Sequence, residues 1–327
     1  PRSTPRPSRR QRQMCIRDRV VDEASMVDLP LMSKLAQALL PATRLILLGD
    51  ADQLASVEAG SVLGDICGRK QINQFSADFI NHIRPVSTVS FMGKPEESSE
   101  ETPEETIAYT GLHDCRVRLT KSYRFAKKSG IPRLSQLVNQ GEAGEAIKLF
   151  KEGKYTDLSW LPLKTGDRLR RLLEKKVVQN FGDLAKQTDP AKALDSMNKF
   201  KVLCVLNHGP HGVSAINQMA TQVHNRNIGK GYGAGTSIWY HGRPVLIRKN
   251  DYHLKLFNGD MGIVLQDPDK ENVLTVFIKN NNGEIRSIAP YRLPKHDTAY
   301  AMTIHKSQGS EFDDVLMVLP ENDTPVL

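Results

Sequence analysis

Two short apolar runs, each followed directly by acidic residues, constrain this chain more than any other feature. The first, VV at 20–21, leads into Asp22 and Glu23; the second, LILL at 45–48, leads into GDADQ, which ends at Gln53. Such runs are typical of central parallel strands buried on both faces. Ligands of open α/β sheets lie beyond the carboxyl ends of these strands, so the acidic residues fall where a nucleotide would bind.

The segment between the two runs predicts a helix. Asp28 can cap it, Pro30 suits its first turn, and apolar residues recur at helical spacing until Pro41 ends it. Strand, helix and strand make one βαβ unit, which indicates an α/β fold.

The acidic residues suggest nucleotide chemistry. Asp22 would hold Mg²⁺ through water, as a Walker B aspartate does, and Glu23 would orient or deprotonate the attacking water. Gln53 has an amide able to bond both a phosphate oxygen and that water. The alternative is that the Asp-Glu pair only caps the following helix, but the second acid-tipped run favours the nucleotide site.

These residues carry a family resemblance. VVDEAS at 20–25 and LLGDADQL at 47–54 resemble motifs II and III of superfamily 1 DNA helicases that move 5′ to 3′, and QLASVEAGSVLGDIC at 53–67 is similar to the RecD-like family in particular. The resemblance spans most of residues 20–327. It implies ATP and Mg²⁺ as cofactors. It also implies RecA-like P-loop motor domains, the first one truncated, with a small inserted SH3-like β-barrel.

The net charge of +8 is concentrated at one end, because residues 1–19 hold seven arginines and one aspartate. About +2 is left for the rest, so DNA binding must depend on local patches. We expect residues 1–19 to be disordered or foreign sequence, since only two apolar residues precede Asp22 where a strand has about five or six. An organelle transit peptide is the alternative.

The chain has no run long enough to span a membrane and no secretory signal. Its four cysteines are scattered without a CxxC pair, which fits a reducing, cytoplasmic location.

The phosphate-binding loop GxxxxGK[ST] does not occur in the sequence. The family carries this loop upstream of VVDEAS, and it carries motif VI, with a second arginine for the γ-phosphate, beyond position 327. The resemblance therefore implies a fragment with half of an ATP site.

The resemblance also implies a domain order. It is a tail at 1–19, the C-terminal part of domain 1A at 20–118, the first part of domain 2A at 119–235, a 2B insertion at 236–295, and the second part of 2A at 296–327. Within 1A, residues 85–106 are rich in Pro, Ser, Thr and Glu and predict a mobile loop, or alternatively an acidic partner site.

LTKSYRF at 119–125 resembles motif IV of the family, whose arginine reaches the γ-phosphate, and Arg124 is the candidate. An ordinary surface arginine is the alternative. Short helices are predicted at Ile131–Asn139 and 143–151, ended by Gly141 and Gly153. A basic amphipathic helix is predicted at 167–181, where it either touches DNA phosphates or presents a solvated face. A strand is predicted at 201–206. LNHGPHGVSAINQ at 206–218 then resembles a RecD-like segment, with a helix from Val213.

Residues 237–293 change to short strands with tight turns, which suggests a small barrel. Asn258-Gly259 and Asn282-Gly283 are the turn signals. Four basic residues in this region either bind single-stranded DNA or belong to an ordinary protein surface. They are Arg243, Arg248, Lys249 and Lys255. The strand candidates are Trp239-Tyr240, Pro244–Ile247, 262–265, 274–278 and Ile285–Ile288.

YAMTIHKSQGSEFDDVLMVLP at 300–320 resembles the motif V region. The resemblance implies that Thr303, His305 and Lys306 contact the DNA backbone and that Glu311 binds the nucleotide ribose. Gly309 allows close backbone approach to an anion. The alternatives are that His305 is an ordinary core histidine and that Glu311 only caps a helix. A buried strand is predicted at 315–319.

The resemblance implies an ATP-driven motor on single- and double-stranded DNA ends, working with RecB and RecC in double-strand break repair and recombination. Two alternatives stay open. One is an inactive fragment or binding-only module, and the other is a stand-alone RecD-like or conjugative helicase.

Overall fold

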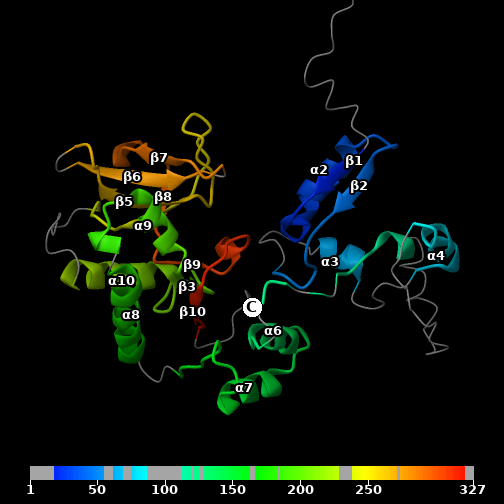
Figure 1. The fold of residues 1–327 in the computed structure, drawn as a ribbon, viewed down its shortest axis with the longest axis horizontal. Helices are drawn as coiled ribbons and strands as arrows, with labels where there is room; N and C mark the ends of the chain where they lie inside the picture. Colours follow the sequence, from blue (N-terminus) through cyan, green and yellow to red (C-terminus); the bar gives the residue numbers. More distant parts are fainter. Residues whose placement is uncertain are drawn as a thin grey trace, which may run out of the picture. The chain divides into compact units, whose positions relative to one another are not determined.

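The computed structural model describes residues 18–54, 62–68, 75–86, 112–119, 121, 123–125, 128–162, 166–182, 184–227, 238–270, 273–280 and 282–320. They form two compact units, Pro1–Leu161 and Pro162–Leu327, each of which is described by itself (Figure 1). The tail before Asp18 and nearly all of the loop expected at 85–106 lie outside the described residues.

The first unit begins with the expected βαβ arrangement. Strand β1 (Asp18–Val21) pairs in parallel with β2 (Arg44–Leu47), and helix α2 (Leu29–Ala38) connects them. The carboxylate of Asp28 accepts a hydrogen bond from the Leu31 amide at 2.7 Å, and Pro30 lies in the first turn. This confirms the predicted helix and its cap.

The structure differs from two expectations about these strands. Asp18 and Arg19 of the expected tail pair with Arg44 and Leu45, so these two residues are not disordered, because the backbone can form a ladder whatever the side chains. That the tail is foreign sequence stays a prediction. The strands were also expected to be buried on both faces. Instead, exposed and half-buried residues alternate along β1 and β2.

The other regular elements of the first unit are helical where it is described. The helices are α3 (Val62–Cys67), α4 (Ala77–Ile83), α6 (Ile131–Asn139) and α7 (Ala143–Glu152), with a short 3₁₀ turn η2 (His113–Cys115). Gly141 and Gly153, at φ 75° and 60°, follow α6 and α7 as the sequence predicted. Asp157 caps α6, because its carboxylate accepts from the Ser129 hydroxyl at 2.6 Å and from the Gly130 amide.

The second unit contains a parallel sheet of order β10-β3-β9. Its strands are β3 (Phe200–Cys204), β9 (Ala301–Thr303) and β10 (Asp314–Val318), and every residue of β3 is buried. Helices α8 (Gly166–Phe181) and α10 (Val213–Asn227) pack against each other and contribute to the core beside this sheet (Figure 1). Leu169, Leu173 and Val177 of α8 are buried in that core, so the predicted basic helix has a clear apolar face.

An antiparallel sheet of order β7-β6-β5-β4-β8 completes the second unit. Its strands are β4 (Pro244–Ile247), β5 (Met261–Gln266), β6 (Leu274–Lys279), β7 (Ile285–Ile288) and β8 (His296–Thr298). Four of the five predicted strands are confirmed. Trp239-Tyr240 is not a strand; β8 takes the fifth place. Among the described residues no ladder joins β7 to β8, so this sheet is not closed into a barrel.

Helix α9 (Pro190–Met197) contacts β3 on one side and β5 and β6 on the other, and Figure 1 shows it beneath the antiparallel sheet. Ile263, Leu265 and Phe277 of that sheet belong to the same apolar core as α8, α10 and β3. The two sheets are therefore parts of one packed body. None of the helices in the described residues is both long and apolar enough to cross a membrane.

Candidate functional site

The acidic segments after β1 and β2 leave the sheet at the same edge. The amide of Leu48 donates to the carbonyl of Val21, and the amide of Ala24 donates back to the carbonyl of Leu48, both at 2.8 Å. The two segments therefore stay hydrogen-bonded past the ends of both strands, through Leu48 and Ala24. Asp22-Glu23 and the 50–53 turn follow at the carboxyl ends, as the sequence predicted.

Asp22 and Glu23 are both exposed, and the Glu23 amide donates to the Asp22 carboxylate at 2.9 Å. Glu23 has a φ of 53°, in the left-handed region that non-glycine residues rarely adopt. It precedes the 3₁₀ turn η1 (Ala24–Met26), and its side chain makes no capping bond there. The alternative in which this pair merely caps the next helix is therefore not what the structure shows for Glu23.

Gly49 is where the chain after β2 meets η1. A Cβ at Gly49 would lie 2.6 Å from the Leu63 side chain and 3.0 Å from the amide nitrogen of Ser25. Glycine is required because the opposing atoms include backbone. The hydroxyl of Ser25 beside it is buried and has no hydrogen-bond partner among the residues that the structure describes.

The 50–53 turn is held by its own aspartates. The Asp52 amide donates to the Asp50 carboxylate at 3.0 Å, and the Gln53 amide donates to the Asp50 carbonyl at 3.2 Å. Asp52 also forms an ion pair with Arg118 at 2.6 Å. This ion pair connects the turn to the segment that leads toward Arg124. Its two residues are 66 positions apart, so no local sequence pattern could predict it.

Arg124 lies in a short described piece, 123–125, and its side chain is exposed. Lys121 lies over the Tyr123 ring at 4.6 Å. By its contacts this segment is part of the first unit, together with Asp22 and Gln53.

The motif V residues of the second unit follow β9. Thr303 is buried at the end of that strand, and its hydroxyl accepts from the Lys306 amide at 3.3 Å. His305 and Lys306 lie in the 3₁₀ turn η5 (His305–Ser307) and are half-buried. Burial lowers the pKa of Lys306, and the nearby Arg248 cation lowers it further.

Gly309 and Glu311 come directly after this turn. Gly309 has a φ of 74°, so the predicted need for glycine is present in the backbone. Glu311 is exposed. The described structure brings Thr303, His305, Lys306, Gly309 and Glu311 into the single connection between β9 and β10, while Asp22, Glu23 and Gln53 gather in the first unit.

The four basic residues of the antiparallel sheet differ in their surroundings. Arg243 is buried, lies over the Trp239 ring at 4.7 Å and donates to Thr298 and to the Ile238 carbonyl, so it stabilises the fold. Arg248, Lys249 and Lys255 are exposed. Arg248 is ion-paired with Asp297 and lies within electrostatic reach of Lys306.

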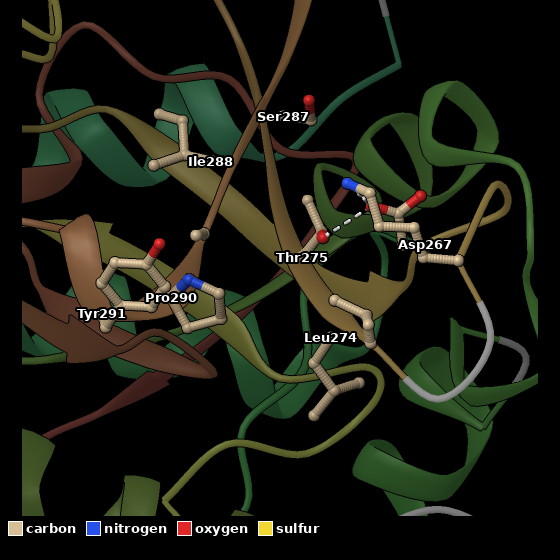
Figure 2. Close-up of a pocket in the computed structure, with 10 residues that line it drawn as sticks. Asp267, Leu274, Thr275, Ser287, Ile288, Pro290 and Tyr291 are labelled. Carbon is tan, nitrogen blue, oxygen red and sulfur yellow. Dashed lines mark hydrogen bonds and ion pairs between the residues drawn. The ribbon is translucent and has the colours of Figure 1, made fainter.

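A hollow of about 430 Å³ lies over β6 and β7 (Figure 2). Thr275 donates to Asp267 at 3.1 Å on one side of it, and Pro290 and Tyr291 line another. None of the residues that the sequence singled out for function lines this hollow, so it is separate from the candidate sites.

Comparison with known families gives the class of protein first. Residues 11–82, which include both acid-tipped strands, match the model of an AAA domain. An α/β fold with carboxylates beyond parallel strands is what such a nucleotide-binding domain requires.

Individual relatives give a closer similarity. The chain is 35% identical to the RecBCD enzyme subunit RecD of Haemophilus influenzae over 94% of its own length and 47% of that protein. It is 32% identical to the RecD subunit of Mycolicibacterium smegmatis over the same share of the chain and 46% of the relative. The resemblance to RecD that the motifs predicted is confirmed, and the chain spans about half the length of these relatives.

Among solved structures, the chain aligns with a Pif1 helicase from Bacteroides in complex with ADP-AlF3 and ssDNA. The TM-score is 0.44 at 17% identity, covering 99% of this chain and 70% of that one.

Proposed function

We propose that this chain is part of an ATP-dependent 5′–3′ DNA helicase subunit of the RecD type, acting in double-strand break repair and recombination. The observation that carries the proposal is the 35% identity to RecD over 94% of the chain. The acid-tipped edge of β1 and β2 and the turn after β9 give that similarity a chemical basis.

The first unit supplies residues that suit ATP and Mg²⁺. The possible metal ligands at the carboxyl ends of these strands are carboxylate and amide oxygens, and Mg²⁺ prefers oxygen ligands. Gly49 allows the segments that follow the two strands to approach each other closely. Among the described residues no three acidic, histidine or cysteine side chains form a metal site. Proteins usually hold Mg²⁺ through one or two carboxylates and the substrate phosphates.

In this proposal Asp22 holds Mg²⁺ through water, Glu23 orients or deprotonates the attacking water, and Gln53 bonds a phosphate oxygen. Bound ATP supplies the γ-phosphoryl group whose transfer to water drives the motor. Arg124 would stabilise charge on that group, Gly309 would approach the nucleotide, and Glu311 would bind its ribose.

Thr303, His305 and Lys306 are the proposed contacts to the DNA backbone. The half-buried Lys306 lies within electrostatic reach of Arg248 and of Asp297, which is ion-paired with Arg248, so these three side chains leave one net positive charge that favours a phosphodiester. The proposal includes RecA-like domains 1A (20–118) and 2A (119–235 and 296–327) with an SH3-like 2B insertion at 236–295, whose antiparallel sheet is open where it is described. The antiparallel sheet supports the last of these in its strand content.

RecB and RecC are the proposed partners, single- and double-stranded DNA ends the substrates, and the cytoplasm the location. The similarity to RecBCD subunits supports the partners.

A binding-only module is the second candidate. ATPase assay with single-stranded DNA, run on the chain alone and again with the upstream domain added, separates the two. Turnover that Glu23→Gln abolishes would establish an ATPase. Turnover that appears only with the upstream domain would support a truncated motor, and DNA binding without turnover in both assays would favour the module.

The DNA contact is tested by binding of a labelled oligothymidylate at several salt concentrations. We expect Lys306→Ala to weaken binding and to reduce the salt slope by about 1, as loss of one phosphate contact does. Lys192→Ala removes an exposed cation of α9 and is the matched control. Equal behaviour of the two variants would refute the assignment of Lys306.

A further inference from the structure

Asn217 of α10 holds the backbone of β9 by two hydrogen bonds. Its side-chain amide nitrogen donates to the Ala301 carbonyl at 3.0 Å, and its oxygen accepts from the Ala301 amide at 2.8 Å. The side chain is buried, with 8% of the residue exposed. Both halves of the amide are therefore used on one residue of the strand.

These bonds lie on the side of β9 that faces away from β3. The Tyr300 carbonyl accepts from the Val202 amide of β3 at 3.3 Å, and the Ile304 amide donates to the Cys204 carbonyl at 3.1 Å. Along a strand these groups alternate in direction, so those of Ala301 point to the opposite edge. β9 is an edge strand of its sheet as described, and Asn217 occupies the position of a neighbouring strand.

The same face of α10 carries a second contact one turn later. The Thr221 hydroxyl lies 3.1 Å from the Tyr240 hydroxyl, which donates to the Tyr300 hydroxyl at 3.3 Å. Tyr300 directly precedes β9. The helix therefore fixes two successive residues, 300 and 301, through polar groups that are costly to bury unless they are bonded.

The held residues lead directly to the candidate DNA contacts. Thr303 is two residues beyond Ala301, and its hydroxyl accepts from the Lys306 amide in the following turn. A shift of β9 would carry this turn with it. We propose that Asn217 is a positioning residue, which fixes β9 so that Thr303 and Lys306 present themselves to the DNA backbone; the proposal rests on the DNA-binding role of those two residues.

Asn217→Asp tests the hydrogen bonds themselves. The ionised carboxylate can still accept from the Ala301 amide, but it has no hydrogen to donate and faces the Ala301 carbonyl. The protonated carboxyl can make both bonds. Burial favours the protonated form, so the defect should be reversible at mildly acidic pH.

The measurement is binding of fluorescein-labelled oligothymidylate to the full chain by anisotropy. At about pH 8 we expect Asn217→Asp to bind roughly tenfold more weakly than wild type, from one lost bond and an unsatisfied carbonyl. The ratio should shrink toward one at about pH 5.5. Gln218→Glu places the same charge on the exposed neighbour and should show neither effect.

Hydrogen exchange gives a readout that does not depend on DNA. The amide of Lys306 should exchange faster in Asn217→Asp than in wild type, because β9 is then held less firmly, and at the wild-type rate in Gln218→Glu. If wild type binds no oligonucleotide, the proposed DNA role fails, and unchanged exchange at Lys306 would separately overturn the positioning role. If wild type binds and the two variants match in affinity, only the positioning role is overturned.

Ile216→Val is the control for a general loss of stability, because it weakens the core at the position just before Asn217 in α10. Equal loss of DNA binding in that variant would show a merely structural role. Should Asn217→Asp not fold at about pH 8, it is compared at about pH 5.5, where the protonated carboxyl can make both bonds, with Asn217→Leu, which has nearly the same shape and keeps neither. Tighter DNA binding by the aspartate variant than by the leucine variant is expected, and equality would overturn the proposal.

Discussion

Strand β3 of the second unit and strands β1 and β2 of the first have the same kind of sequence but opposite burial. All five residues of β3 are buried, whereas exposed and half-buried residues alternate in the other two. β3 lies between β10 and β9, with α8 and α10 beside one face and Leu246 and Met302 among the residues on the other. The comparison teaches that a short apolar run predicts a strand, while its neighbours decide its burial.

The largest change in the free energy of unfolding is expected for a substitution of Lys201, the charged residue inside β3. It is fully buried, donates to the Ala299 carbonyl at 3.1 Å and lies 5.5 Å from the centre of the Phe312 ring. Burial lowers its pKa from 10.5 to about 8. The fold therefore disfavours the protonated form, and the cost is fully present below pH 8 and disappears as the pH approaches 10.5.

We expect Lys201→Met to raise the free energy of unfolding by about 2–3 kcal/mol at neutral pH. The advantage should shrink as the pH rises from 8 to 10.5 and vanish above 10.5, because only there is the wild-type lysine neutral in both the folded and the unfolded state. Urea denaturation across this range measures it. Lys199→Met removes an exposed lysine just before β3 and should show no such trend; a trend shared by both variants would contradict the assignment.

The burial difference itself is tested by one substitution made twice. Val202→Ala removes methyl groups from a residue that is 1% exposed, and Val20→Ala does so where 59% is exposed. We expect losses of about 2 kcal/mol and less than about 0.5 kcal/mol, respectively. Comparable losses would mean that β1 is covered as well as β3.

The chain offers a clean way to follow each unit. Its two tryptophans are Trp160, in the first unit, and Trp239, in the second. Fluorescence of Trp160→Phe reports the second unit alone, and Trp239→Phe reports the first. Each valine variant is therefore measured in the background that reports its own unit.

Much of the fold was readable because its signals are local. Asp28 and Pro30 begin α2, glycines end α6 and α7, and apolar runs mark β4 to β7. β8 was missed because HDT at 296–298 has no apolar pattern; it is a strand because β4 pairs with it.

The candidate sites were readable in part. The positions of Asp22, Gln53 and Lys306 follow from strand ends, which the sequence marks. The Asp52–Arg118 ion pair and the Asn217–Ala301 bonds join residues far apart in the chain, and no local pattern records them. Asn217 did lie in the LNHGPHGVSAINQ segment, and a polar residue on the inner face of an apolar helix was the available signal.

The smallest difference in stability is expected between two variants of Glu23. This residue has the left-handed backbone conformation, which no residue of β3 adopts. A left-handed backbone costs a residue with a Cβ roughly 1–2 kcal/mol, and glycine avoids this cost but loses more freedom on folding. We therefore expect Glu23→Gly to be more stable to urea than Glu23→Ala by about 1 kcal/mol. Both variants lack the carboxylate, so the difference isolates the backbone. Equal stability would mean that the φ of 53° is not strained, and the acid-tipped edge would then resemble β3 in storing no strain.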